Sequence, residues 1–183
     1  MLDIANRITL PDMTEQLRYV VVRAFPGFEV RRYPEHALVE VRVESEFERG
    51  AALAFRPLSR YLDGDNHTAT SFAMTAPVLQ QPDGPSQQVV SFVLPHDIDL
   101  ASVPLPRDAS LSIRVVPPHE AAALRFRGRW STKHFFEHGE KLLEDVGAAD
   151  LLALGPIYYA RFDPAFKPGF LKHNEALVRV TSA

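Results

Sequence analysis

The chain has 183 residues, of which 46% are hydrophobic and 23% charged, and its net charge is −3. This length and composition are typical of one globular domain and exclude a disordered protein. Positive and negative side chains are mixed along the whole chain, so we expect no extended basic surface and no binding of nucleic acid.

The chain contains no cysteine. Disulfides therefore cannot hold the fold together, and a bound iron would have no thiolate ligand. The first residues lack the charged start and continuous apolar core of a secretory signal, and no stretch approaches the ~18 apolar residues of a membrane helix. We expect a soluble, cytoplasmic protein that does not contact membranes.

Three short segments of the first half alternate apolar and polar residues, which predicts half-buried strands. They are residues 19–23, 28–33 and 38–43. Pro34 and Glu35 predict a hairpin turn between the second and third segments, with His36 at the surface. Ser45 is predicted to cap a helix that ends near Leu62.

This first helix has two distinct faces. The face expected to pack on the core contains Phe47, Ala51, Ala54, Phe55, Leu58 and Leu62. A second stripe contains Arg49, Leu53, Arg56 and Arg60. Such a stripe is commonly the solvated side of an amphipathic helix, and this interpretation stays open beside a functional one. Pro57 lies within the pattern and predicts a kink or an interruption.

The helix is followed by predicted strands at 76–80 and 89–94, separated by a Pro-Asp-Gly-Pro turn at 82–85. Pro77 lacks a backbone N–H donor, so the segment 73–78 is predicted to be the entrance or edge of a strand. Met74 lies among small residues, which favours core filling over iron ligation.

A proline-rich stretch at 103–106 is predicted to join the two halves of the chain. The second half predicts strands at 111–116, 121–127, 157–162 and 176–181. Between them lies a predicted helix at 132–146, capped by Ser131 and ended by Gly147.

The two halves resemble each other at an offset of 83 residues, where 30–36 aligns with 113–119 and an arginine, a proline and a histidine coincide. This predicts one domain, 1–183, with pseudo-repeats at about 18–100 and 108–183, although chance similarity between proline turns stays open. Two β-α-β-β units of this kind predict an α+β fold. In it two helices flank a curved, mainly antiparallel sheet or a distorted barrel.

Five motifs occur in a fixed order, at 28–34, 73–78, 92–95, 162–168 and 174–175. In that order they resemble the SOUL heme-binding family, over the range from Phe28 to Val180. The resemblance implies the same architecture, which is also similar to bacterial effector-binding domains. It also implies a non-enzymatic protein that binds a tetrapyrrole (heme, a porphyrin or a bilin) reversibly and without a covalent bond.

The site implied by the resemblance lies between the first helix and the loop before the last strand. A tetrapyrrole needs an apolar wall and cations for its propionates. Matched by motif, the basic positions are Arg60 and Lys167, and Arg56 precedes Arg60 by one helical turn. The complete set of expected binding residues is Leu53, Arg56, Arg60, Phe166, Lys167, Phe170 and Lys172.

The chain departs from the family at the position proposed as an iron ligand in some animal members. It has Arg32 before Tyr33, where those members have a histidine, and Lys172 and His173 where the family has a basic pair. We therefore predict no metal ligand and no catalytic residue, but loose tetrapyrrole binding that tolerates iron-free porphyrins and bilins.

Two other functions stay open. One is a binding module for another hydrophobic effector or a protein partner, using the same groove. The other is a zinc hydrolase, because His134, Glu137 and His138 fit the inverted zinc-protease pattern. A catalytic zinc site takes a third protein ligand, which the remaining sequence does not clearly supply, and short motifs of this kind often match by chance.

Overall fold

The structure is a computed structural model that describes residues 14–182. The helices are α1 (Phe47–Leu62) and α2 (Thr132–Ala148), with short 3-10 turns at Leu100–Ser102 and Gly169–Leu171. The strands are β1 (Glu15–Gln16), β2 (Val20–Phe25), β3 (Phe28–Tyr33), β4 (His36–Glu44), β5 (Thr75–Ala76), β6 (Val78–Pro82), β7 (Gln87–Val93), β8 (Leu111–Val116), β9 (His119–Arg127), β10 (Leu151–Arg161) and β11 (His173–Ser182).

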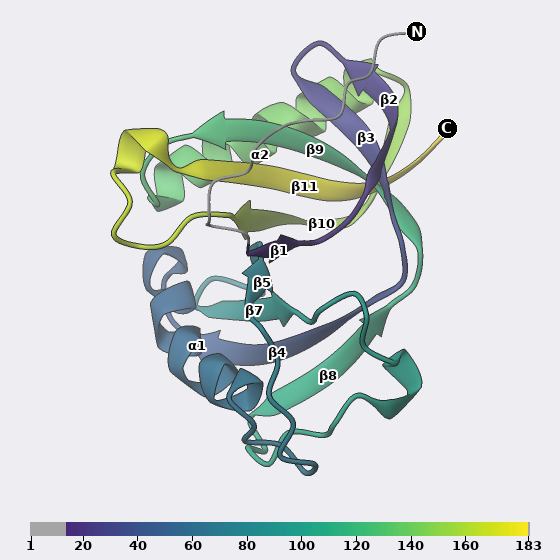
Figure 1. Cartoon of the computed structure of the whole chain (residues 1–183). Helices are drawn as coiled ribbons and strands as arrows, with labels where there is room; N and C mark the ends of the chain where they lie inside the picture. The colour runs from purple at the N-terminus through teal and green to yellow at the C-terminus, as the bar shows by residue number, and fades with distance from the viewer. Residues whose placement is uncertain (1–13, 183) are drawn as a thin grey trace, which may run out of the picture.

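Nine strands form one antiparallel sheet in the order β2-β3-β9-β11-β10-β6-β7-β4-β8, and β1 pairs with β5 in parallel. The order is symmetrical about the central β10–β6 pair, with β11 matching β7, β9 matching β4, and β3 matching β8. The predicted α+β fold with two β-α-β-β units is confirmed. The sheet is strongly curved but open, because no ladder within the described residues joins β2 to β8 (Figure 1).

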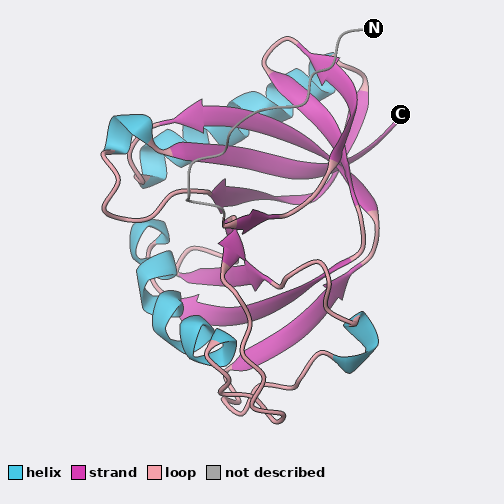
Figure 2. Ribbon diagram, viewed as in Figure 1, coloured by secondary structure: helices cyan, strands magenta, loops and turns pink. Residues whose placement is uncertain are grey.

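Both helices lie on the outer side of the curved sheet, α2 against β9, β10 and β11, and α1 against β4, β6 and β7 (Figure 2). Phe135, Leu142 and Val146 fix α2 to its half of the sheet, and Ala54 and Leu58 fix α1 to the other half. Each helix thus has its own apolar core. Among the described residues, no helix covers the inner, concave face of the sheet.

Some details of α1 differ from expectation. The helix is continuous through Pro57, and its N-cap is Glu46 and not Ser45. Phe55 is 48% exposed, whereas Tyr61 is fully buried in the core. The buried Tyr61 hydroxyl donates a hydrogen bond of 2.8 Å to the Pro104 carbonyl, which satisfies its polar atom.

The predicted hairpin at Pro34 and Glu35 is wrong. β3 pairs with β2 and β9, whereas β4 pairs with β7 and β8. The two-residue connection carries the chain from one half of the sheet to the other, and the connection between β8 and β9 does the same in the opposite direction. Because of this crossing, His36 is 7% exposed and faces the interior, not the surface.

Three further segments differ from the sequence-based predictions. β10 begins at Leu151, earlier than expected, because a shift in its pairing between Leu154 and Tyr158 accommodates the intervening glycine and proline. Pro77 precedes β6 as a strand entrance, but β6 itself is central in the sheet. Met74 is 41% exposed and fills no core.

The second helix follows the prediction closely. The Ser131 side chain accepts a hydrogen bond from the His134 backbone N–H, as an N-cap should, and the helix continues to Ala148, past Gly147. Neither helix in residues 14–182 is long and apolar enough to cross a membrane.

Candidate functional site

The expected binding residues of α1 point away from the sheet. Leu53 is 47% exposed, Arg56 is exposed, and the Arg60 side chain is 62% exposed. Arg60 Nη2 donates a 2.6 Å hydrogen bond to the Asp65 carboxylate just past the helix end. These three residues, hereafter the outer face of α1, present one apolar group and two cations to solvent.

The other expected residues lie in segment 162–172, hereafter the proline loop. Phe166 is 90% exposed and Phe170 is 73% exposed. Lys167 forms an ion pair with Asp163 within the loop. Lys172 differs from them because it is only 7% exposed. The loop thus offers two uncovered aromatic rings, while one of its two lysines points inward.

The proline loop begins beside the N-terminal end of α1. Arg161, the residue just before the loop, lies 5.3 Å from the ring centroid of Phe47, the first residue of α1. Within residues 14–182, no hydrogen bond or ion pair joins the outer face of α1 to the proline loop. The loop thus meets the N-terminal end of α1, whereas Arg60 lies in the last turn of the helix.

A cavity of about 310 Å³ lies on the concave face of the sheet, where sequence reasoning predicted no site. Its walls come from both halves of the chain, and Leu17, Leu79 and Leu177 form part of its apolar lining. Leu17 and Leu79 also pack against two separate apolar clusters of the concave face. The cavity thus sits where the two halves meet.

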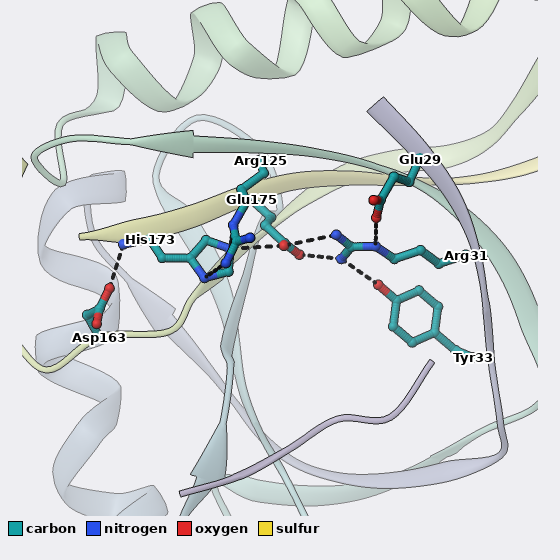
Figure 3. Close-up of polar contacts among 7 residues, drawn as sticks. All are labelled: Glu29, Arg31, Tyr33, Arg125, Asp163, His173 and Glu175. Carbon is teal, nitrogen blue, oxygen red and sulfur yellow. Dashed lines mark hydrogen bonds and ion pairs between the residues drawn. The ribbon is translucent and has the colours of Figure 1, made fainter. Parts of the chain in front are cut away.

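A buried ion pair forms part of the cavity wall (Figure 3). Arg31 Nη1 and Nη2 donate to the two Glu175 carboxylate oxygens at 2.7 and 3.1 Å, and Arg31 Nε donates to Glu29 at 3.0 Å. Burial alone would raise the pKa of Glu175, but hydrogen bonds from His173 and Arg31 outweigh it and lower this pKa. Burial raises the pKa of the neighbouring Tyr33 hydroxyl to about 12.

The same carboxylate connects the cavity to the proline loop. His173 Nε2 lies 3.0 Å from Glu175 Oε1, and the His173 ring stacks on Phe162 with centroids 4.1 Å apart. The backbone N–H of His173 donates to Asp163, the partner of Lys167 (Figure 3). Through these contacts the start of β11 anchors one end of the loop.

Arg31, Tyr33 and Glu175 lie within two of the motifs that carry the family resemblance, 28–34 and 174–175, but the sequence does not indicate a common role for them. The arginine and the glutamate are 144 positions apart, so no local pattern links them. Their side chains meet because β9 pairs with both β3 and β11.

Two histidines at matching positions of the pseudo-repeats also line the cavity. His36 Nδ1 donates to the Pro34 carbonyl at 2.8 Å, and His119 Nδ1 donates to the Pro117 carbonyl at 3.0 Å. Their ring centroids are 5.9 Å apart. Burial lowers the pKa of both imidazoles, and the nearby positive charge of Arg114 lowers both further. The 83-residue offset between the pseudo-repeats aligns these two histidines, but it does not predict that they line a cavity.

We expect these histidines to make the protein less stable in mild acid. In the folded protein their pKa lies below the ordinary histidine value of 6.5. Below about pH 6.5 the unfolded chain therefore binds more protons than the folded protein, and the free energy of unfolding falls. Replacing both by asparagine, which can still donate to the proline carbonyls, should flatten the loss of unfolding free energy between about pH 7.5 and 5.5. Urea unfolding at both pH values measures this change. An equal loss of unfolding free energy between the two pH values in variant and wild type would contradict the prediction.

The two α2 histidines that fit the inverted zinc-protease pattern each have a hydrogen bond to a backbone carbonyl. His134 Nε2 donates to the Arg127 carbonyl at 2.8 Å and His138 Nδ1 donates to the His134 carbonyl at 2.7 Å, while Glu137 lies 3.8 Å from Lys133. Both imidazoles pack against Phe126. Within residues 14–182, the only three potential metal ligands close enough to share an ion are Glu15, His96 and Asp97, far from this pair in sequence.

Arg32, which replaces the proposed iron-ligating histidine, lies on the outer face of β3. Its side chain is 64% exposed and pairs with Glu120 at 2.7 Å. Tyr33 points to the concave face, because successive side chains of a strand alternate. This position therefore contacts neither the cavity nor the proline loop through its side chain.

Comparison with solved structures supports the fold. The C-terminal domain of EcmrR superposes with a TM-score of 0.67 at 12% identity, covering 85% of this chain and 98% of that domain. A protein from Listeria innocua described as a hydrolase gives a TM-score of 0.60 at 8% identity, covering 87% of this chain and 94% of its own. Identities this low establish similar architecture only. No curated protein sequence matches the chain significantly.

A family model identifies the chain more specifically. The model described as SOUL heme-binding protein matches residues 14–179, which is nearly the whole chain. The match includes all five ordered motifs. The chain belongs to the SOUL heme-binding protein family.

Proposed function

We propose that this protein binds a tetrapyrrole reversibly at the surface formed by the proline loop and the outer face of α1. The observation that carries the proposal is the exposure of Phe166 (90%) and Phe170 (73%) on one short loop. Large apolar side chains grouped on a surface mark binding sites. Their flat rings match the flat face of a tetrapyrrole, and Lys167 in the same loop and Arg60 near the C-terminal end of α1 offer positive charges for its acidic side chains.

The proposal does not require ligation of iron. Arg32 occupies the position of the proposed histidine ligand, and its exposed side chain pairs with Glu120. Affinity would then come from apolar contact and from charge-assisted hydrogen bonds to the propionates. Heme, iron-free porphyrins and linear bilins share both features, so the protein should accept all three. A binding role without catalysis is part of this proposal.

Absorbance titration tests the proposal. Purified protein at micromolar concentration should shift the spectra of hemin, protoporphyrin IX and biliverdin, each with saturation near one ligand per chain. Similar affinities for hemin and protoporphyrin IX are expected because iron contributes no ligand bond. If none of the three ligands shows a saturable shift, the protein is not a tetrapyrrole binder.

The concave-face cavity favours a second candidate function, the binding of a smaller hydrophobic effector. Its volume of about 310 Å³ is at the lower end of the range for ligand pockets, ~300 to 1,000 Å³. Its wall combines leucines with buried polar groups, as ligand pockets do. The two candidates place the ligand on opposite faces of the sheet, so locating a bound ligand separates them.

A further inference from the structure

Arg161, at the end of β10, has a buried guanidinium group with two donor atoms that have no hydrogen-bond partner in residues 14–182. The residue is 3% exposed, and neither its Nε nor its Nη2 atom makes a hydrogen bond within the described part of the chain. Burial lowers its pKa to about 10, with no opposing contribution from a carboxylate. The group thus stays charged at neutral pH. Buried charges are normally paired because desolvation is costly, so this arginine needs an explanation.

Aromatic rings surround the Arg161 guanidinium on several sides. Its central carbon lies 5.3 Å from the centroid of Phe47, 5.0 Å from that of Trp130 and 5.4 Å from that of Phe135. Ring faces attract a cation but accept few of its five N–H donors. The rings come from the first residue of α1, from the β9–α2 connection and from α2. They make a rigid aromatic enclosure that leaves the donors unsatisfied.

Lys172 places a second cation against the same tryptophan. Its Nζ lies 3.7 Å from the Trp130 ring centroid and donates to the Ala165 carbonyl at 2.9 Å, which leaves two donors free. Burial lowers the pKa of Lys172, and the positive charge of Arg161 lowers it further. Two like charges therefore share one ring beneath the proline loop.

The nearby carboxylates are engaged elsewhere. Asp163 pairs with Lys167 and accepts the backbone N–H of His173. Glu48, in the first turn of α1, accepts hydrogen bonds from the backbone N–H and hydroxyl of Thr132 at 2.9 and 3.3 Å. Neither carboxylate forms an ion pair with Arg161 or Lys172 within the described residues. Asp163 raises the pKa of Lys172 through its charge, but within residues 14–182 neither buried cation has a carboxylate at ion-pair distance.

We propose that Arg161 and Lys172 form a seat for a carboxylate of the bound ligand. This inference rests on the proposed function and deepens it, because it assigns a tetrapyrrole propionate to these two residues. The planar guanidinium fork can donate two parallel hydrogen bonds to a carboxylate. Because the Arg161 donors are buried, the carboxylate reaches them when the proline loop shifts and Lys172 releases the Ala165 carbonyl to donate to the same carboxylate. The ligand ring then lies along the exposed phenylalanines of the proline loop.

A comparison of protoporphyrin IX with its dimethyl ester tests the seat, because esterification removes both negative charges and keeps the ring. Wild-type protein should bind the diacid about 10- to 100-fold more tightly than the diester, as expected for charge-assisted hydrogen bonds. Arg161→Gln should reduce this preference by weakening diacid binding alone. Arg161→Lys keeps the positive charge but not the planar fork, so its preference for the diacid should lie between those of wild type and Arg161→Gln.

Controls separate this inference from the general proposal. Arg161→Gln removes an unpaired buried charge, so its thermal midpoint should not fall, whereas a purely structural arginine would destabilise the fold when replaced. Lys172→Gln is the second variant and should reduce the same preference. Equal binding of diacid and diester by wild type would overturn the seat and leave tetrapyrrole binding intact. If wild-type protein binds neither the diacid nor the diester, the proposed tetrapyrrole-binding function is itself wrong.

Discussion

Arg31→Met and Glu175→Gln should each lower the free energy of unfolding by about 3–5 kcal/mol, because each removes the main counter-charge of a buried side chain and only the partly exposed Glu29 remains beside Arg31. The two side chains are 4% and 3% exposed and are joined by two hydrogen bonds. The double variant should lose less than the sum of the single losses, because the groups interact directly. Urea unfolding at neutral pH measures all three values.

The neighbouring ion pair between β3 and β9 provides a matched control. Arg32 and Glu120 form an ion pair of the same length, 2.7 Å, but their side chains are 64% and 31% exposed. Arg32→Met should therefore change the free energy of unfolding by at most about 1 kcal/mol. If Arg31→Met and Arg32→Met lower the free energy of unfolding equally, burial of the Arg31–Glu175 pair does not determine its contribution to stability.

Reversing the charge of Arg60 or Lys167 should weaken tetrapyrrole binding by about 10- to 100-fold each, which corresponds to the loss of one charge-assisted hydrogen bond. Both side chains have internal partners, Asp65 and Asp163, which the propionates would have to replace. Absorbance titration of Arg60→Glu and Lys167→Glu measures the effect. Unchanged affinity in both variants would move the site elsewhere.

Two further variants sharpen the interpretation of these charge reversals. Arg23→Glu carries the same change on β2, at the edge of the sheet, where the residue is exposed and distant from α1 in the fold, and should leave affinity unchanged (Figure 1). Asp65→Asn removes the competitor of the propionate for Arg60 and should tighten binding. A loss of affinity in Asp65→Asn would show that Arg60 must be held by its aspartate.

Local patterns predict the elements of this fold well because the information lies within a few residues. Alternation indicates the strands, and Ser131 marks the start of α2. The crossing after Pro34 is different, because the same two residues fit either a hairpin or a passage to the other half of the sheet. Only the pairing of β3 with β9 decides between them.

The candidate site is predictable in part. Motif comparison indicates the exposed residues of the proline loop, but it treats Lys172 as equivalent to Lys167, although the structure buries the first and exposes the second more fully. Arg161 has no local signal at all. An arginine at the end of a strand is ordinarily solvated, and its burial depends on three rings supplied by distant parts of the chain.

The position of a bound tetrapyrrole is the most direct test of this account. The chain has one tryptophan, Trp130, whose indole N–H donates to Asn174 at 3.0 Å, so it gives a single indole signal in an amide NMR spectrum. Titration with protoporphyrin IX should move this signal and the amide signals of residues 163–171 most. If the largest shifts occur at Tyr33 and His36 while the indole signal stays in place, the ligand binds in the concave cavity and the account is wrong.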